Sequence, residues 1–90
     1  MKFPITSIDV DREIRRIRRR YNREKPGLGE DFFDNVNARI AFVCEYSNSG
    51  SIAGKEIRRI KVTRFPYHLY YRIESDVIWI VAIIHNRQDR

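Results

Sequence analysis

The chain has one cysteine and no long apolar stretch, and each shortage excludes a class of protein. A single cysteine, Cys44, cannot form an internal disulfide, so a disulfide-stapled secreted domain is excluded. The longest apolar run, Val77 to Ile84, has eight residues, against the roughly 20 that a membrane-spanning helix needs. No apolar run of the signal-peptide kind opens the sequence, so we expect a cytoplasmic protein with no membrane partner.

Histidine, cysteine and glycine are also too few or too scattered for common chemical sites. The two histidines, His68 and His85, and the one cysteine have no zinc-ligand spacing, so we expect no metal. The four glycines lie at turn positions and form no phosphate loop. No base lies near the serines at 47, 49 and 51 to activate a nucleophile. We therefore expect no cofactor.

Ninety residues, 42% of them hydrophobic, predict a single domain, residues 1–90, with one small core. The net charge is +6, which favours a polyanion or an acidic protein as partner. This charge is uneven. Residues 12–25 hold eight basic and two acidic side chains, residues 26–54 hold one and four, and residues 55–72 hold six and one. Two basic patches therefore flank a mildly acidic middle.

The first part of the chain predicts a short strand and a helix. Lys2 to Thr6 includes Pro4, which suits an edge strand. Ser7 or Asp9 can cap the helix that follows. Apolar residues then recur on one helical stripe that we expect to face the core, namely Val10, Ile14, Ile17 and Tyr21.

A break from Lys25 to Gly29 predicts a helical hairpin. The second helix is expected to begin near Glu30 and Asp31, and its apolar face comprises Phe32, Phe33, Val36, Ile40, Val43 and Cys44. Phe42 falls outside that face. It is either a contact for another chain or a phenylalanine folded back under the following loop.

The remaining sequence predicts a linker and three strands. Tyr46 to Gly54 is rich in Ser, Asn and Gly and is expected to be a flexible connection. The runs Lys55–Thr63, Arg64–Glu74 and Val77–Ile84 then predict a β-meander, with the last strand deep in the sheet and covered on both faces. The fold class is α+β, in which an N-terminal short strand precedes a helical hairpin packed on a mainly antiparallel sheet that ends in a three-stranded meander.

The middle run of the meander divides into two faces. One face carries Tyr67, Leu69, Tyr71 and Ile73, and the other carries His68, Tyr70, Arg72 and Glu74. Aromatic rings stack on bases and guanidinium groups bind phosphates, so the second face has the chemistry of an RNA-binding surface. A solvated face with arginines screening a small core explains the same residues.

An ordered set of short motifs resembles the RelE/ParE superfamily of bacterial type II toxins, and more closely its ParE-like, plasmid-stabilisation branch. The motifs are a helix ending in a tyrosine, Pro26-Gly27-Leu28-Gly29 with Phe32-Phe33, Arg58-Arg59, Arg64-Phe65-Pro66-Tyr67 with Tyr70-Tyr71-Arg72, and the tail His85-Asn86-Arg87-Gln88-Asp89. The resemblance covers almost the whole chain. The fold that it implies, a helical hairpin on an antiparallel-type sheet, agrees with the pattern of elements above.

The resemblance implies a growth-inhibiting toxin that binds DNA gyrase and is neutralised in a hetero-oligomer by a cognate antitoxin, whose acidic or disordered segment folds on binding. Candidate antitoxin-binding residues are Arg15, Arg16, Arg19, Arg23 and Phe42. The arginines also suit an ordinary solvated helix face. Candidate residues for binding the target or a nucleic acid are Arg59, Lys61, Arg64, Tyr70 and Arg87.

Two alternatives stay open. The RelE-like branch cleaves mRNA on the ribosome, and this chemistry would assign Arg58 and Arg72 to the phosphate, His85 as the acid, and Lys55 or Glu56 as the base. Glu56 can instead be a surface residue paired with Arg58, and His85 can be structural. The tail also lacks the final catalytic tyrosine of some nuclease members. The other alternative is a degenerate toxin kept as an antitoxin-binding component.

Overall fold

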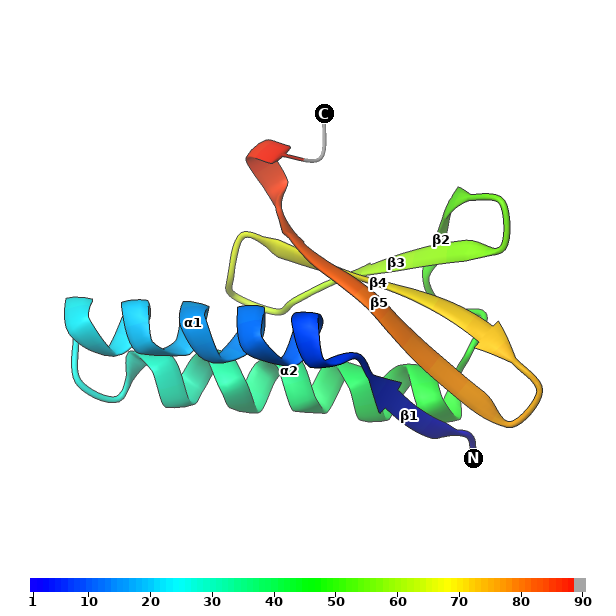
Figure 1. The fold of residues 1–90 in the computed structure, drawn as a ribbon, viewed down its shortest axis with the longest axis horizontal. Helices are drawn as coiled ribbons and strands as arrows, with labels where there is room; N and C mark the ends of the chain where they lie inside the picture. The colour runs from blue at the N-terminus through cyan, green and yellow to red at the C-terminus, as the bar shows by residue number, and fades with distance from the viewer. Residues whose placement is uncertain (89–90) are drawn as a thin grey trace.

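The computed structural model describes residues 1–88, which fold as two helices packed on one face of a five-stranded sheet (Figure 1). The elements are β1 (Phe3–Thr6), α1 (Ile8–Glu24), α2 (Leu28–Glu45), β2 (Ser51–Gly54), β3 (Ile57–Lys61), β4 (Tyr67–Glu74), β5 (Val77–His85) and the 3-10 turn η1 (Asn86–Gln88). The sheet order is β1-β5-β4-β3-β2, and its one parallel pair within these residues is β1 with β5. The predicted α+β fold is confirmed. Asp89, the end of the tail motif, lies outside the described residues.

Helix α1 begins and packs as the sequence predicted. The Ser7 hydroxyl accepts a hydrogen bond from the Val10 amide at 3.2 Å, which caps the first turn. Val10, Ile14 and Ile17 are buried, and Tyr21 packs against them from the edge of the core. The apolar stripe therefore holds α1 on the sheet and leaves its arginines outside.

The turn between the helices is tighter than the predicted five-residue break, because α2 already begins at Leu28. Gly27 has φ +90°, a left-handed conformation that strains other residues. The Gly29 amide donates to the Asn22 side-chain oxygen at 2.8 Å, and a Cβ at Gly29 would overlap the backbone oxygen of Arg18. The two glycines therefore bring the helices into close contact.

Helix α2 contributes the other half of the helical layer. Phe32, Val36, Val43 and Cys44 are buried, whereas Phe33 and Ile40 are partly buried, so the predicted apolar face is confirmed. An aromatic cluster joins the helices to the sheet, with ring centroids 5.1 to 5.6 Å apart among Tyr21, Phe32, Phe65 and Tyr67. Neither described helix has the length and apolar content that crossing a membrane requires.

The sheet is covered on one face only. Tyr67, Leu69 and Tyr71 of β4 point toward the helices and are buried, as are Ile78, Ile80 and Ile83 of β5. No helix among residues 1–88 covers the opposite face, which we call the outer sheet face (Figure 1). Strand β5 does lie inside the sheet, between β1 and β4, but its expected cover on both faces is wrong, since Val81 is 39% exposed.

A bulge keeps the apolar residues of β5 directed toward the helices. Tyr70 pairs with Ala82 but Tyr71 pairs with Ile80, so Val81 is an extra residue on β5. Ile80 and Ile83 are both buried although they are three residues apart. A regular strand would have turned one of them outward.

The predicted flexible linker is wrong at its C-terminal end. Ser51 to Gly54 forms β2, which pairs antiparallel with β3 at the edge of the sheet. The preceding loop is fixed by the buried Tyr71, whose hydroxyl accepts from the Gly50 amide at 3.0 Å and donates to the Ser47 carbonyl at 2.7 Å. Lys55 and Glu56 form the turn into β3 and do not begin a strand.

Candidate functional site

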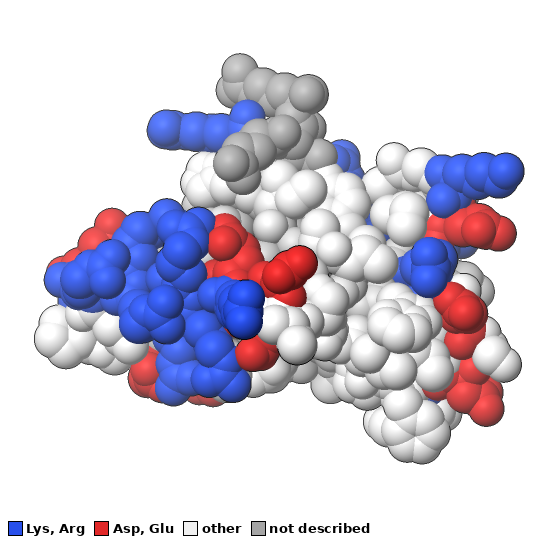
Figure 2. All heavy atoms as spheres, viewed as in Figure 1, with Lys and Arg blue, Asp and Glu red and all other residues white. Residues whose placement is uncertain are grey.

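Seven of the 18 Lys and Arg residues lie on α1, where Figure 2 shows a dense group of Lys and Arg side chains. We use the name α1 arginine face for four of the five exposed arginines of this helix, Arg15, Arg16, Arg19 and Arg23. Arg15 is paired with Asp11 at 2.8 Å, and Arg16 with Glu13 at 2.5 Å. No carboxylate among the described residues lies within 4 Å of Arg19 or Arg23. These two arginines therefore hold uncompensated charge.

Phe42 does not join the α1 arginine face. It is 37% exposed near the end of α2, packs on Tyr46 with ring centroids 5.1 Å apart, and lies 4.9 Å beneath the Arg39 guanidinium. A shallow hollow of about 360 Å³ brings it beside Arg59 and Lys61 of β3. The structure therefore places this predicted antitoxin residue next to predicted target-binding residues.

Three of the five predicted target-binding residues gather on the outer sheet face. Arg59 lies directly opposite Tyr70, and Lys61 lies opposite His68. Directly opposed residues project from the same face of an antiparallel pair. Arg64 is elsewhere, in the turn before β4, where it lies 3.9 Å from Asp31 of α2. The remaining residue, Arg87, is on η1.

The residues predicted for a nuclease occupy two separate places. Arg58, Arg72 and Glu56 line one hollow of about 630 Å³, and Lys55 is exposed in the adjacent turn. There the Arg58 guanidinium donates to the Gly50 carbonyl at 2.8 Å, and Arg72 is 3.0 Å from Glu74. His85 does not join them.

The distance between the two places follows from the register of β4 with β5. Arg72 is opposite Trp79, whereas His85 is opposite Tyr67. The five residue-to-residue steps from Tyr67 to Arg72 span about 17 Å of strand. The structure therefore does not bring the three predicted catalytic residues around a single phosphate.

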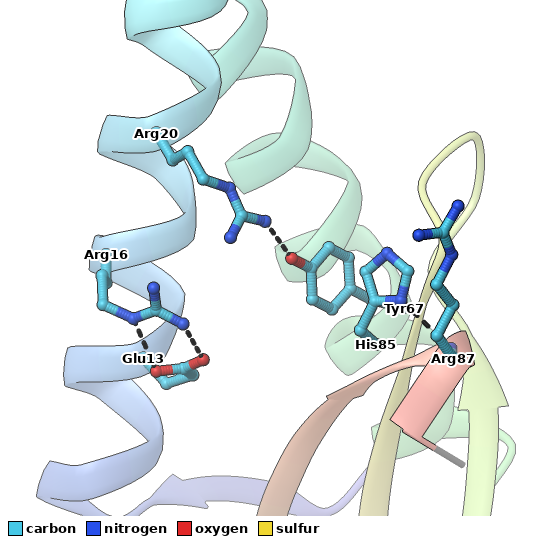
Figure 3. Close-up of a pocket in the computed structure, with 6 residues that line it drawn as sticks. All are labelled: Glu13, Arg16, Arg20, Tyr67, His85 and Arg87. Atoms are coloured by element: carbon cyan, nitrogen blue, oxygen red, sulfur yellow. Dashed lines mark hydrogen bonds and ion pairs between the residues drawn. The ribbon is translucent and has the colours of Figure 1, made fainter. Parts of the chain in front are cut away.

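His85 lines a different hollow, between α1 and the end of β5, which Figure 3 shows in close-up. We call it the α1–β5 hollow. Its volume is about 310 Å³ and its lining residues are Glu13, Arg16, Arg20, Tyr67, His85 and Arg87. Arg20 reaches from α1 and donates to the Tyr67 hydroxyl. His85 packs edge-on against the Tyr67 ring, with centroids 5.0 Å apart.

Hydrogen bonds fix the proton positions in the α1–β5 hollow. The guanidinium of Arg16 donates twice to Glu13, which lowers the pKa of that carboxyl and makes it a weak base. His85 Nδ1 accepts from the Arg87 amide at 3.1 Å, so a neutral imidazole carries its proton on Nε2. The hollow thus presents mainly donors, which suits binding of an anion. Among residues 1–88 no cluster of three His, Cys, Asp or Glu could hold a metal ion.

The sequence assigned three residues of this hollow to three different roles, and missed the other three. Arg16 was expected to bind the antitoxin, His85 to act as an acid and Arg87 to bind the target. Glu13, Arg20 and Tyr67 received no role. The hydroxyl of Tyr67 was the feature of the sequence that could have revealed this hollow. A tyrosine that points toward the helices at the start of a strand must find a partner for its hydroxyl.

Comparison with known proteins identifies the family. The sequence model for "ParE toxin of type II toxin-antitoxin system, parDE" matches residues 6–90. A solved chain from the chromosomal ParDE toxin–antitoxin system of P. aeruginosa has the same fold, with a TM-score of 0.81, 15% identity, and coverage of 94% of this chain and 96% of that one. No curated protein matches the sequence. The resemblance found in the sequence motifs is confirmed, and the chain belongs to the ParE toxin family of type II toxin–antitoxin systems.

Proposed function

We propose that this toxin arrests growth by binding DNA gyrase, without performing chemistry on a substrate, and that a cognate antitoxin holds it inactive. The observation that carries the proposal is the separation of His85 from Arg58 and Arg72. Cleavage of RNA requires the acid and the phosphate-binding cations to reach the same phosphate. Binding has no such requirement, because its contacts can be spread over a surface.

The outer sheet face is the surface that we assign to gyrase. Arg59, Lys61 and Tyr70 lie at its β3–β4 side. On β5, the exposed or half-buried residues of the same region are Trp79, Val81, Ala82 and Ile84. Aromatic residues and arginine are enriched at protein interfaces, with apolar groups at the centre and charges at the rim. The composition of this face therefore suits a protein partner.

The α1 arginine face is the surface that we assign to the antitoxin. Arg19 and Arg23 have no carboxylate within 4 Å among the described residues, whereas the charges of Arg15 and Arg16 are already compensated within the helix. An acidic antitoxin segment would gain the most binding free energy from Arg19 and Arg23, since these arginines need not first break an existing ion pair. In this arrangement toxin and antitoxin form a hetero-oligomer in the cytoplasm.

The test is to induce the chain alone in bacteria and to examine plasmid topology and mRNA integrity in the same culture. We expect growth to stop with altered supercoiling or broken DNA while transcripts stay whole. Co-induction of the antitoxin should restore growth. Transcripts cut within codons would indicate that the toxin acts by ribosome-dependent cleavage of mRNA and not by binding gyrase. Unaffected growth with a folded chain would instead indicate a degenerate, antitoxin-binding component.

A further inference from the structure

The α1–β5 hollow gathers positive charge from two distant parts of the chain. Arg16 and Arg20 come from α1, and Arg87 comes from η1 after the last strand. The bidentate pair with Glu13 satisfies Arg16. Arg20 donates to the neutral Tyr67 hydroxyl, and no carboxylate within residues 1–88 lies within 4 Å of Arg20 or Arg87. The uncompensated charge of the hollow therefore belongs to Arg20 and Arg87.

Two further donors face the same space. The Tyr67 hydroxyl accepts from Arg20, and its own proton has no acceptor among the described residues. Tyr67 is 4% exposed and cannot turn away, because its ring packs against Phe32 and His85. His85 Nδ1 is occupied by the Arg87 amide, which leaves the Nε2 proton to be donated. Both donors are therefore held in place before any ligand arrives.

Donors that converge from a helix, two strands and a turn suit a tetrahedral anion. A planar carboxylate has two oxygens and is satisfied by one guanidinium fork, as Glu13 is by Arg16. A phosphoryl group has three terminal oxygens and can accept from Arg20, Tyr67, His85 and Arg87 together. The volume of about 310 Å³ lies at the small end of ligand sites, which fits a phosphate with one attached group.

We propose that the α1–β5 hollow binds a phosphoryl group, carried either by a free nucleotide or by the backbone of a nucleic-acid strand. Arg20 and Arg87 supply the charge, and Tyr67 and His85 supply oriented donors. The site is separate from the outer sheet face assigned to gyrase, and the inference does not depend on that assignment.

The experiment is a titration of the purified chain followed by ¹H–¹⁵N NMR, including the arginine Nε–H signals. Sodium phosphate, a 5′-mononucleotide and a ten-nucleotide single-stranded DNA are added separately, with sodium chloride holding ionic strength constant. We expect saturable shifts at Tyr67, His85 and Arg87. Arg20→Gln and Arg87→Gln should each weaken phosphate binding about tenfold, since each removes a charged donor.

The matched control is Arg23→Gln, which removes the same charge from an exposed position of α1 outside the hollow and should leave binding within twofold of the wild type. Arg87→Gln keeps the test valid if Arg20→Gln disturbs folding, because the Arg87 side chain makes no hydrogen bond to another described residue. Tighter binding of the oligonucleotide than of the mononucleotide identifies a strand as the source, and equal binding identifies a free nucleotide.

Three results would overturn the proposal. One is a set of shifts that grow linearly without saturation. Another is equal weakening by Arg20→Gln, Arg87→Gln and Arg23→Gln, which would mean that phosphate is attracted only by the general positive field of α1. The third is displacement of phosphate by a ten-residue poly-glutamate peptide that binds the same residues more tightly, because the hollow would then be a carboxylate site.

Discussion

Arg72 and His85 lie at opposite ends of the β4–β5 pair, with Arg72 beside Trp79 and His85 beside Tyr67. The intervening strand is about 17 Å long. Two groups at that separation cannot act on the same phosphate in one conformation of the sheet, since a catalytic acid must come within hydrogen-bond distance of its substrate. This relationship favours a toxin that acts by binding.

Replacement of Arg72 by alanine separates the two mechanisms. Arg72 makes an exposed ion pair with Glu74 at 3.0 Å, which contributes about 0 to 1 kcal/mol to folding. Arg72 lies opposite Trp79 on the outer sheet face, and because binding energy is spread over many contacts, we expect Arg72→Ala to raise the inducer concentration that arrests growth by no more than about tenfold. Loss of a catalytic phosphate contact would instead reduce activity by about 10²-fold or more. Dose–response curves of growth, with protein levels measured by immunoblot, distinguish the two outcomes.

Charge reversal on the α1 arginine face tests the antitoxin surface. Arg19→Glu combined with Arg23→Glu should weaken antitoxin binding at least tenfold and reduce its dependence on salt, because both uncompensated charges are replaced by repulsive ones. Binding is measured by calorimetry at 50 and 300 mM NaCl. Lys55→Glu, a single charge reversal on the exposed turn between β2 and β3, is the control. Equal loss in the control would assign the effect to net charge alone.

The loop before β2 is held in place by the hydroxyl group of Tyr71. Tyr71→Phe removes the partner of both the Gly50 amide and the Ser47 carbonyl in a buried setting, so we expect it to lower the free energy of unfolding by about 1–3 kcal/mol. Tyr46→Phe, at a position that is 56% exposed, should change it by less than about 0.5 kcal/mol. Urea denaturation measures both variants. A change in Tyr71→Phe no larger than that in Tyr46→Phe would mean that the loop is not anchored through this hydroxyl.

The segment that follows this loop, β2, is an element that could not be predicted from the sequence. The spacing of apolar residues was sufficient to predict α1, α2 and the buried face of β4, because each buried position in these elements is occupied by an apolar or aromatic residue. Strand β2 was missed since Ser51 to Gly54 has a loop composition, and its strand geometry comes from pairing with β3. The exposed Val81 was missed for a similar reason, because an apolar run does not reveal which face the helices cover.

The candidate site was harder to predict than the fold. Arg20, Tyr67 and His85 are far apart in sequence and meet only through the packing of α1 on the sheet and the register of β4 with β5. The two groups of nuclease candidates were separated by the same register. Residue type indicated phosphate-binding chemistry, but the pairing of the strands decides which side chains share a hollow.

Glu13 gives the fold a defined pH dependence. The hydrogen bonds from Arg16 lower the pKa of Glu13 in the folded state, and the charges of Arg16 and Arg20 add to the effect. The pair therefore stabilises the fold above the unfolded pKa of about 4.3, and this stabilisation is lost as the pH falls through the lower folded value. Because the pair is largely exposed, its contribution at pH 7 is below about 1 kcal/mol.

Glu13→Gln should therefore be slightly less stable than the wild type at pH 7, and the difference should shrink as the pH falls below the unfolded pKa of about 4.3. Chemical denaturation at pH 7, 5 and 3 measures this difference. Glu45→Gln, which removes an exposed carboxylate without an ion pair among the described residues, should show no such convergence. A stability difference for Glu13→Gln that grows toward low pH would contradict the account.

The most direct measurement is DNA supercoiling by purified gyrase in the presence of the purified chain. We expect inhibition or gyrase-dependent DNA breaks at micromolar toxin. Either effect should be weakened at least tenfold by Arg59→Glu with Lys61→Glu and retained in Lys55→Glu, because the first pair lies on the outer sheet face. The cognate antitoxin should restore supercoiling. Supercoiling that continues unchanged at micromolar concentrations of the folded wild-type chain, with no DNA breaks, would contradict it.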